Sequence, residues 1–327
     1  MRWRGWLGWD PGVERSQNSH IFEINKPFSK SHSKVVFGIL KTSLMKLSSL
    51  NKSKTSISKT KPLIGIIGGS GFDLFSEMTA LEHVKPLTKF GYPSDEITIG
   101  NYAGVTIAFL PRHGKNHQWP PHRIPYKANI AALEAVGVKY IFATCIAGSL
   151  KKRIKPGSVV IPDQFVNFTW GRDDSFDADG GYSHIPMKNP YCAHLRDALK
   201  LSVRKITKNV FPKGTVVVVQ GPRFSTKAES KFFNKNGWDI INMTQYPECC
   251  FAREMGMCYA AFAVITDYDV GIQKEFTMEP ENIAAVEKIF KFAVTRTKDI
   301  LATLITTYAK DISCNCAIKI VGSYERH

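Results

Sequence analysis

Short apolar stretches alternate with longer amphipathic stretches from residue 62 onward. Short runs of β-branched, aromatic and apolar residues are typical of buried strands, whereas apolar residues three and four positions apart are typical of one helix face. The pattern predicts strands at 63–67, 97–99, 105–110, 140–145, 158–161, 215–219, 240–242 and 259–265. It predicts helices at 126–135, 190–203, 226–236, 247–255 and 281–307. Strands interleaved with helices indicate an α/β fold, a single domain with a central mixed β-sheet flanked by helices.

Residues 1–61 do not share this pattern. They are rich in Ser and Lys and have no sustained apolar period, which is typical of a disordered segment. We therefore predict a disordered basic extension at 1–61, a folded domain at 62–310 and a C-terminal tail at 311–327. Within the domain, 168–182 carries four acidic residues and three glycines, so we expect a long loop that is a candidate lid.

The formal net charge of +16 is unevenly distributed. Residues 1–61 hold twelve Lys or Arg and three acidic residues, which accounts for +9 of the total. The domain is only mildly basic and the extension has no nucleic-acid-binding signature, so we do not expect a nucleic-acid partner. A basic nucleic-acid-binding protein that carries the α/β domain as a passenger is the alternative from a different class.

The same composition bears on the cellular location. No apolar run is long enough to span a membrane, so we expect a soluble protein without a membrane partner. Asp10, Pro11 and Glu14 interrupt an early amphipathic helix, which argues against mitochondrial targeting. We expect the protein in the cytoplasm, with the nucleus as a second location.

Seven cysteines are present, and their spacing does not form the framework of a secreted disulfide-rich domain. A reducing compartment is therefore the expected environment. Cys314 and Cys316 are too close together for a zinc knuckle, and no second pair of this kind occurs in the sequence. We predict two free thiols in the tail and no metal site.

Two motifs at strand ends are suited to anion binding. Gly68-Gly69-Ser70-Gly71 follows the first strand and lets the backbone approach an anion closely. It lacks the third glycine of a dinucleotide site and the Gly-Lys-Ser/Thr of a P-loop, and a tight turn without a ligand is the alternative. Arg112-His113 follows another strand, and its arginine can make a forked contact to two phosphate oxygens. A simple surface pair is the alternative there.

Two carboxylates end a third apolar strand. Asp267 and Asp269 point to the same side if the strand continues, which suits two contacts along one edge of a planar heterocycle. A carboxylate accepts a hydrogen bond from an exocyclic amine, and a protonated carboxyl donates to a ring nitrogen. Met243 is suited to pack against a sugar, and Thr244 adds a hydroxyl group. A solvated strand cap and ordinary core residues are the alternatives.

Seven motifs occur in the order 64–71, 111–114, 147–150, 221–225, 242–244, 247–248 and 266–269. Together they resemble the trimeric purine nucleoside phosphorylase and methylthioadenosine phosphorylase family over residues 62–310. The resemblance implies a nucleoside phosphorylase-like domain and a pentosyltransferase. The implied reaction is phosphate-dependent cleavage of 5′-methylthioadenosine to adenine and 5-methylthioribose 1-phosphate, a step of purine and methionine salvage. The alternative within the family is a phosphorylase for adenosine, inosine or guanosine.

The resemblance also implies which residues would hold the two substrates. Those expected to bind phosphate are Ser70, Arg112, His113, Cys145, Ile146 and Thr244. Cys145-Ile146 stands where a hydroxyl residue followed by alanine is usual in animal members of the family. Met243 would pack on the ribose. Asp267 and Asp269 would bind the base, and Asp267 would be the catalytic residue that assists protonation of its N7.

Three further residues and the expected partners follow from the same resemblance. Ser225 and Pro280 would set the purine specificity, and His184 would reach the 5′ pocket of a neighbouring subunit. The implied partners are a nucleoside, phosphate and other copies of the chain, as a trimer or a dimer of trimers. No metal or organic cofactor is implied, because inorganic phosphate is a co-substrate.

Overall fold

The computed structural model describes residues 63–71, 78–176, 182–274, 277–279, 282–309, 312–314, 316 and 323–324. The predicted extension at 1–61 and the predicted specificity residue Pro280 lie outside the described residues. The C-terminal tail is described only in part.

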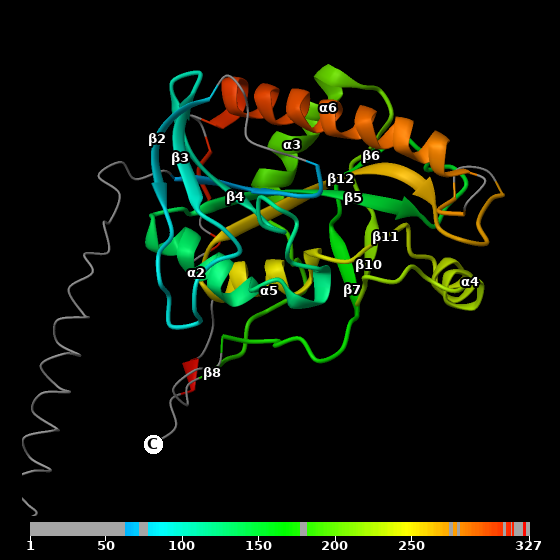
Figure 1. Ribbon diagram of the computed structural model, residues 1–327, viewed down its shortest axis with the longest axis horizontal. Helices are drawn as coiled ribbons and strands as arrows, with labels where there is room; N and C mark the ends of the chain where they lie inside the picture. The colour runs from blue at the N-terminus through cyan, green and yellow to red at the C-terminus, as the bar shows by residue number, and fades with distance from the viewer. Residues whose placement is uncertain are drawn as a thin grey trace, which may run out of the picture. The chain divides into compact units, whose positions relative to one another are not determined.

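The centre of the described structure is one mixed sheet (Figure 1). Its strands are β1 (Ile64–Gly68), β2 (Thr79–Val84), β3 (Ile97–Tyr102), β4 (Val105–Pro111), β5 (Tyr140–Ser149), β6 (Val159–Val160), β7 (Gln164–Phe168), β9 (Val210–Phe211), β10 (Thr215–Val219), β11 (Ile240–Asn242) and β12 (Cys258–Tyr268). Strand β1 is parallel to β4 and β5, and β12 is parallel to β5, whereas β2 and β3 pair in the antiparallel sense. Strand β11 is antiparallel to β5 and parallel to β10. A separate two-stranded sheet joins β8 (Tyr182–Ser183) to β13 (Ser323–Tyr324).

Helices cover both faces of the sheet. They are η1 (Pro121–Arg123), α2 (Tyr126–Ala135), α3 (Ala193–Ile206), α4 (Lys227–Lys235), α5 (Gln245–Glu254) and α6 (Ile283–Tyr308). Figure 1 shows α3 and α6 on one face of the sheet and α2 and α5 on the other. Each pair buries its own apolar cluster against the strands, which gives the helix–sheet–helix layering predicted for this fold class. Within the described residues no helix combines the length and apolarity needed to cross a bilayer.

The predicted elements agree with the observed ones where the apolar pattern is strong. The helix predicted at 126–135 has the observed bounds, and the helix predicted at 226–236 is α4, which begins with a capping box in which the Thr226 hydroxyl accepts from the Glu229 backbone N–H at 3.2 Å. Strands β2, β7 and β9 were missed. Strand β2 lies at the sheet edge and is largely exposed, and β9 has only two residues, so neither carries a long apolar signal.

The topology brings several strand ends together. The carboxyl ends of β1, β4, β5 and β12 meet at one edge, because these strands are parallel neighbours. Strand β11 runs antiparallel to the last residues of β5, with Ile240 opposite Ser149 and Ile241 opposite Gly148. The chain after Asn242 therefore runs back along β5, away from its carboxyl end.

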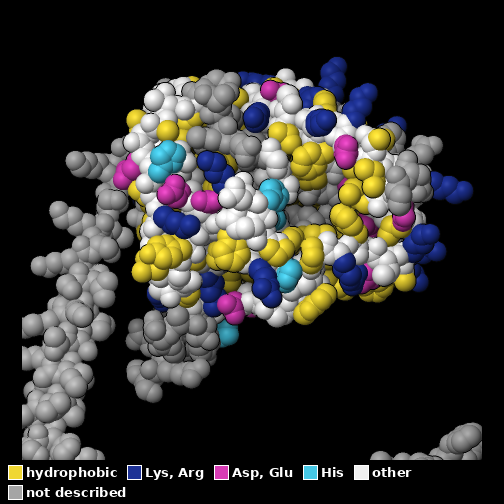
Figure 2. Space-filling model, in the orientation of Figure 1, with side chains coloured by type: hydrophobic (Ala, Val, Ile, Leu, Met, Phe, Trp, Pro, Cys, Tyr) yellow, Lys and Arg dark blue, Asp and Glu magenta, His cyan; other side chains and the backbone are white. Residues whose placement is uncertain are grey.

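Charged side chains are dispersed over one face of the described structure. On the face shown in Figure 2, Lys and Arg side chains are interspersed with acidic and apolar ones and do not gather into one continuous band. This face therefore offers no extended basic track of the kind that follows a nucleic-acid backbone.

Candidate active site

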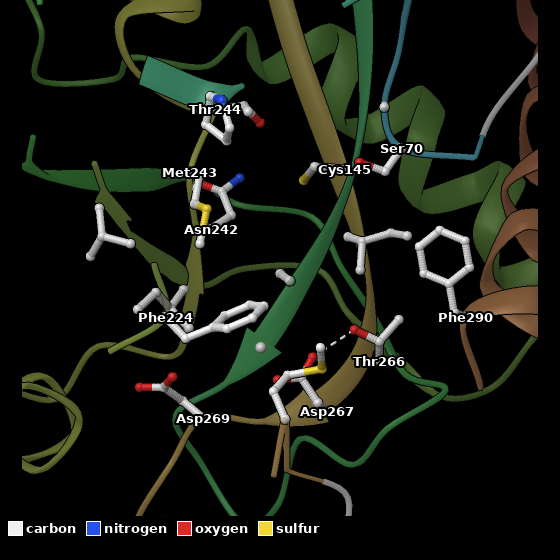
Figure 3. Close-up of a pocket in the computed structure, with 18 of the residues that line it drawn as sticks. Ser70, Cys145, Phe224, Asn242, Met243, Thr244, Thr266, Asp267, Asp269 and Phe290 are labelled. Carbon is white, nitrogen blue, oxygen red and sulfur yellow. Dashed lines mark hydrogen bonds between the residues drawn. The ribbon is translucent and has the colours of Figure 1, made fainter. Parts of the chain in front are cut away.

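One cavity of about 270 Å³ collects most of the predicted site residues (Figure 3). The predicted residues that line it are Ser70, Arg112, His113, Cys145, Ile146, Ser225, Met243, Thr244, Asp267 and Asp269. They come from β5, from β12 and from the segments that follow β1, β4, β10 and β11. His184 is exposed and is not among the lining residues.

The cavity has two chemically different ends. Figure 3 shows Ser70, Cys145 and Thr244 near one end and Asp267, Asp269 and Phe224 near the other. Met243 and Asn242 lie between them. The Ser70 and Thr244 hydroxyls thus lie toward one end of the cavity and the two carboxyl groups toward the other.

A buried ion pair fixes the cationic group. Arg112 and Glu248 are each 1% exposed, and Nε and Nη2 of the guanidinium donate to the two carboxylate oxygens at 2.7 and 2.9 Å. Arg112 Nη1 donates to the Thr144 carbonyl at 2.8 Å. Burial opposes the charged form, but the adjacent Glu248 carboxylate raises the pKa of Arg112 further above its usual range. These three bonds use three of the five guanidinium N–H groups, so the other two can face a ligand in the cavity.

The imidazole of His113 is neutral. Its Nδ1 lies 2.8 Å from the Trp119 carbonyl oxygen, which can only accept, so this nitrogen carries the proton. Burial lowers the pKa of His113 to about 4, the hydrogen bond to Trp119 opposes the shift, and the charge of Arg112 adds to it. Of the Arg112-His113 pair, only Arg112 is charged, and Nε2 of His113 can accept a hydrogen bond.

The glycine-rich turn after β1 approaches β5 closely. A Cβ atom on Gly69 would lie 2.8 Å from the Thr144 carbonyl oxygen, so only glycine fits there. The Gly69 N–H donates to the Thr144 hydroxyl at 2.9 Å and is not offered to a ligand. The turn therefore brings the half-buried Ser70 to the cavity wall beside Arg112.

Thr244 faces the same end of the cavity from the first position before α5. Its hydroxyl makes no capping hydrogen bond to the helix, and Thr244 is 7% exposed. Tyr246 has non-helical backbone angles (φ −107°, ψ 137°), so the regular part of α5 begins after it, and Thr244 contributes its hydroxyl group to this end without a helix dipole.

Cys145 is part of the cavity wall, but its thiol already has partners. The Gln245 side-chain amide donates to Cys145 Sγ at 3.1 Å, and the thiol donates to the Phe262 carbonyl at 3.5 Å. Burial raises the pKa of Cys145, so the thiol is neutral. The backbone of Cys145-Ile146 is the part best placed to contact a ligand.

A β-bulge aims Asp267 into the cavity. The register of β12 against β5 shifts between Ile265 and Asp267, so the side-chain alternation changes at this point. A Cβ atom on the facing Gly148 would lie 3.2 Å from Asp267 Oδ2, and its absence leaves room for the carboxyl. The Thr266 hydroxyl donates to Asp267 Oδ1 at 2.6 Å. Burial raises the pKa of Asp267 to about 6, the Thr266 hydrogen bond opposes the shift, and nearby Asp269 adds to it.

Three buried polar side chains in this cavity have no hydrogen-bond partner among the described residues. They are Asp269 at Oδ2, Ser225 at Oγ and Asn242 at both amide atoms. Burial raises the pKa of Asp269, although the nearby Ser230 and Ser225 hydroxyls oppose this without forming well-aligned hydrogen bonds. Buried polar groups are rarely left unpaired in native structures, so their gathering in one cavity indicates a polar ligand.

The segment after β7 supports the middle of the cavity. Arg172 donates to the backbone carbonyls of Met243 at 3.0 Å, Tyr246 at 2.6 Å and Gln220 at 2.8 Å. The segment is described up to residue 176, and these bonds attach it to the turn that carries Met243. Of the candidate lid at 168–182, the part around Arg172 is thus bonded to this turn, and residues 177–181 lie outside the described structure.

An apolar wall completes the cavity opposite Met243. Val286 and Phe290 of α6 contribute to it together with Met278, and Phe290 faces the interior in Figure 3. Gly71 has a φ of +71° and lies against the Phe290 ring, so the turn after β1 and the start of α6 fit closely together. This wall suits an apolar substituent.

Sequence reasoning did not assign a role to several of these residues. Glu248 was part of a recognised motif, and a carboxylate inside an apolar helix could have been read as the partner of a buried cation. Asn242, Phe224 and Phe290 gave no signal of their own, because a polar residue at a strand end and aromatic residues in a helix or loop are common in any fold.

Comparison with known proteins agrees with the fold and with this arrangement. The sequence model of the Phosphorylase superfamily matches residues 63–306. The S-methyl-5′-thioadenosine phosphorylase of Nitrosopumilus maritimus is 45% identical over 254 residues, covering 78% of this chain and 95% of the relative. That of Pyrococcus furiosus is 41% identical over 256 residues, covering 78% of this chain and 96% of the relative.

Solved structures resemble the chain as well. A methylthioadenosine phosphorylase from Schistosoma mansoni in complex with adenine superposes with a TM-score of 0.73 at 34% identity, covering 79% of this chain and 96% of the other. A methylthioadenosine phosphorylase from an antarctic soil metagenomic library also gives a TM-score of 0.73 at 34% identity, covering 80% and 92%. The family model, the sequence relatives and the solved structures all point to the same family, and the chain belongs to the Phosphorylase superfamily.

Proposed function

We propose that this chain cleaves the glycosidic bond of 5′-methylthioadenosine with inorganic phosphate, giving adenine and 5-methylthioribose 1-phosphate. The observation that carries this proposal is the single cavity with an anion-binding end and a carboxyl end. Relatives named S-methyl-5′-thioadenosine phosphorylase, at 41–45% identity over nearly their whole length, support it. The proposed activity makes the protein a pentosyltransferase of purine and methionine salvage.

The phosphate would lie at the end that contains Arg112. Here the free N–H groups of the guanidinium, the Thr244 hydroxyl at the start of α5 and Ser70 converge on one space. Glu248 neutralises the Arg112 charge, so affinity would depend on oriented donors more than on net charge. Neutral His113 can accept a hydrogen bond from a protonated phosphate oxygen at the same end.

The base would lie between Asp267 and Asp269. Ionised Asp269 can accept from the exocyclic amine of adenine, which would satisfy its unpaired Oδ2. Burial raises the pKa of Asp267 to about 6, so its protonated form is available near neutral pH and can donate to N7 as the bond to the sugar breaks. The leaving base would then depart neutral instead of as an anion.

The ribose would lie between these two ends. As the base departs, positive charge develops on the sugar ring, and the phosphate at the opposite end stabilises that charge before it bonds to the anomeric carbon. Met243 would pack on the sugar, and Arg172 holds its backbone in place. The apolar wall of Val286 and Phe290 suits a methylthio group better than the 5′-hydroxyl of adenosine, which would be desolvated there without a partner.

A purine nucleoside phosphorylase that acts on inosine or guanosine is the second candidate. A 6-oxo purine presents an acceptor where adenine presents a donor, and an ionised carboxylate cannot donate to it. Ser225 lies beside Asp269 in the cavity and is the proposed specificity residue among the described residues. The carboxyl pair therefore favours adenine.

The first prediction concerns the substrate. With 5′-methylthioadenosine, adenosine and inosine assayed side by side, we expect base release only when phosphate is present. We expect kcat/KM to be highest for 5′-methylthioadenosine, lower for adenosine and lowest for inosine. Chromatographic measurement of the free base in matched reactions with and without phosphate checks this. A higher kcat/KM for inosine than for 5′-methylthioadenosine would replace the proposal with the second candidate.

The second prediction concerns Asp267. The Asp267→Asn variant should lose about 2 to 4 kcal/mol of transition-state stabilisation with 5′-methylthioadenosine, the range for losing one positioned polar group. Its preference should shift toward inosine, because an amide can donate to a 6-oxo group. Exposed Asp197 on α3, changed to Asn in the same way, is the matched control and should leave kcat/KM unaltered. An unchanged ratio of adenosine to inosine turnover would exclude Asp267 from the base site.

The third prediction concerns Arg112. Arg112→Lys keeps a cation beside Glu248, so the fold is retained, but the forked contact is lost. The KM for phosphate should rise roughly ten- to a hundredfold, because a hydrogen bond to a charged group contributes about 1.5–3 kcal/mol. The KM for the nucleoside should change much less. Arg153, an exposed arginine paired with Asp239 at 2.8 Å, provides the control as Arg153→Lys. Equal increases in both KM values for Arg112→Lys would contradict a phosphate role.

Assembly and location complete the proposal. A cleft of about 420 Å³ lined by exposed Phe168, Trp170 and Phe232 also includes Ser225, so an apolar surface adjoins the active-site cavity. Such surfaces commonly pack against another protein, and we assign this one to the contact of a homotrimer in which His184 reaches a neighbouring cavity. Light scattering should give three copies, and a fully active monomer would contradict the assignment.

We place the enzyme in the cytoplasm, which fractionation of the source cells would test.

A further inference from the structure

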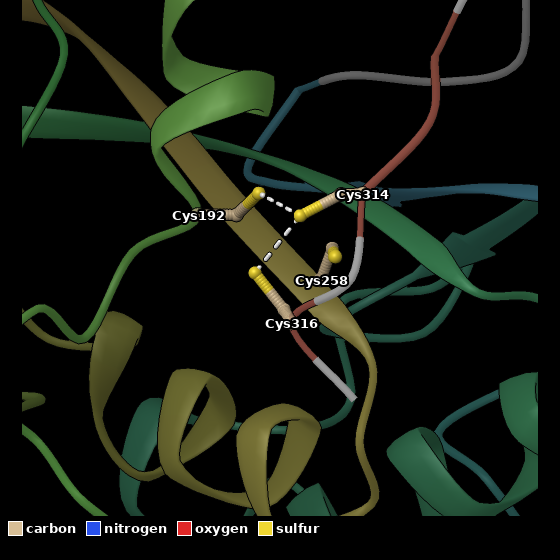
Figure 4. Close-up of side chains that lie close together, drawn as sticks. All are labelled: Cys192, Cys258, Cys314 and Cys316. Carbon is tan, nitrogen blue, oxygen red and sulfur yellow. Dashed lines mark hydrogen bonds between the residues drawn. The ribbon is translucent and has the colours of Figure 1, made fainter. Parts of the chain in front are cut away.

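Four cysteine side chains from distant parts of the chain meet outside the active-site cavity (Figure 4). Cys192 immediately precedes α3, Cys258 begins β12, and Cys314 and Cys316 follow α6. Their Sγ atoms all lie within 4.8 Å of one another. Cys314 Sγ is 3.5 Å from that of Cys192 and 3.0 Å from that of Cys316, and all four are free thiols.

We propose that this cluster is a structural zinc site with four thiolate ligands. Zinc takes four sulfur ligands at about 2.3 Å in a tetrahedron, which places the sulfur atoms about 3.8 Å apart. The observed separations of 3.0 and 3.5 Å are shorter than that value, and all four sulfur atoms lie within 4.8 Å of one another, so small side-chain movements would complete a tetrahedron. Four protein ligands leave no open position, so the metal would be structural and would take no part in phosphorolysis.

Two of the four ligands are fixed by the sheet. Cys192 and Cys258 are 3% and 4% exposed. The Cys192 N–H donates to the Tyr259 carbonyl at 2.8 Å, and the Cys258 N–H donates to the Lys139 carbonyl at 2.9 Å. These bonds hold one half of the site in the absence of metal. Cys314 and Cys316 are half-buried and come from the segment after α6, so they would close the site.

The surroundings suit a thiolate cluster. A cleft of about 740 Å³ reaches Cys192, Cys314 and Cys316 and offers a route for a metal ion from solvent. Zinc with four thiolates carries a net charge of about −2, and the cleft contains more basic than acidic side chains. Its basic members are Lys188, His194, Arg196, Lys213 and Arg253, against Asp163.

The contacts favour one four-membered cluster over two separate pairs. Cys314 lies close to both Cys192 and Cys316, so the thiols form a connected group. A disulfide bond joins sulfur atoms at about 2.05 Å, well below either distance. Spacing along the sequence predicted no metal site, because Cys314 and Cys316 have no second pair nearby in the chain. In the fold, Cys192 and Cys258 complete the set.

A bound zinc would attach the segment after α6 to the start of α3 and of β12. Because the ligands are assembled only in the folded chain, zinc binding would stabilise the fold, and its affinity would fall at low pH as the thiolates are protonated. This role is independent of the proposed phosphorylase activity, since none of the four cysteines lines the active-site cavity.

Zinc content and disulfide state test the proposal directly. The full-length chain, purified under reducing conditions without chelator, should contain about one zinc ion per chain by elemental analysis. The Cys314→Ser/Cys316→Ser variant should lose this zinc and keep its phosphorolysis rate. Cys250→Ser makes the same chemical change at a buried cysteine outside the cluster and should retain the metal. Replacing zinc by cobalt(II) in the wild-type chain should give the visible spectrum of a tetrahedral tetrathiolate.

The same measurements can overturn it. Zinc-free wild-type protein in which mass spectrometry finds Cys192, Cys258, Cys314 or Cys316 in disulfides would replace the metal with a covalent link. Equal zinc content in the wild type and in the Cys314→Ser/Cys316→Ser variant would place the metal elsewhere. The cobalt spectrum needs no variant, so a tetrathiolate signature that fails to form in the wild type would refute the site even if the variants do not fold.

Discussion

The buried pair of Arg112 and Glu248 is the interaction on which the rest of the candidate site depends. Both side chains are 1% exposed, and removing one member of such a pair costs about 3 to 5 kcal/mol because the other charge is left alone in a low-dielectric interior. The Tyr259 hydroxyl donates to Glu248 at 2.7 Å, so the pair also joins β4, α5 and β12. The guanidinium can therefore hold only one orientation, with its remaining N–H groups toward the cavity.

The cavity has two regions of different charge. At the Arg112 end, burial lowers the pKa of His113 and the charge of Arg112 adds to this shift, so the imidazole is neutral. At the other end, burial raises the pKa of both Asp267 and Asp269, because no cation in the cavity lining lies beside them. A phosphorolytic reaction needs this separation: an anion on one side of the sugar and a proton donor on the other.

Much of this arrangement could be predicted from the sequence, because the chemistry sits where apolar strands end. Ser70, Arg112 and Asp267 each follow or close a strand, and the parallel order of these strands brings their ends together, whereas Thr244 follows β11, which is antiparallel to β5. What could not be predicted depends on distances across the fold. The ion pair joins residues 136 positions apart, and the β-bulge before Asp267 depends on the register of β12 against β5.

Other misses have the same origin. Edge strand β2 is largely exposed and has too few apolar residues for the pattern to predict a strand, and β9 is too short to carry a pattern. The neutral state of His113 follows from burial, which no local pattern reports. The four-cysteine cluster was missed because its members are far apart in the chain and meet only where α3, β12 and the segment after α6 come together. Sequence patterns thus located the polar groups, and the fold determined their partners and their charges.

The central claim is that phosphate attacks the anomeric carbon from the Arg112 end while the base leaves from the Asp267 end. Phosphorus NMR of a reaction containing 5′-methylthioadenosine and inorganic phosphate tests it most directly. The account predicts that the inorganic phosphate signal is replaced by that of a sugar 1-phosphate, in step with the adenine released. Adenine release with the inorganic phosphate signal unchanged would mean that water is the nucleophile, and it would contradict the account.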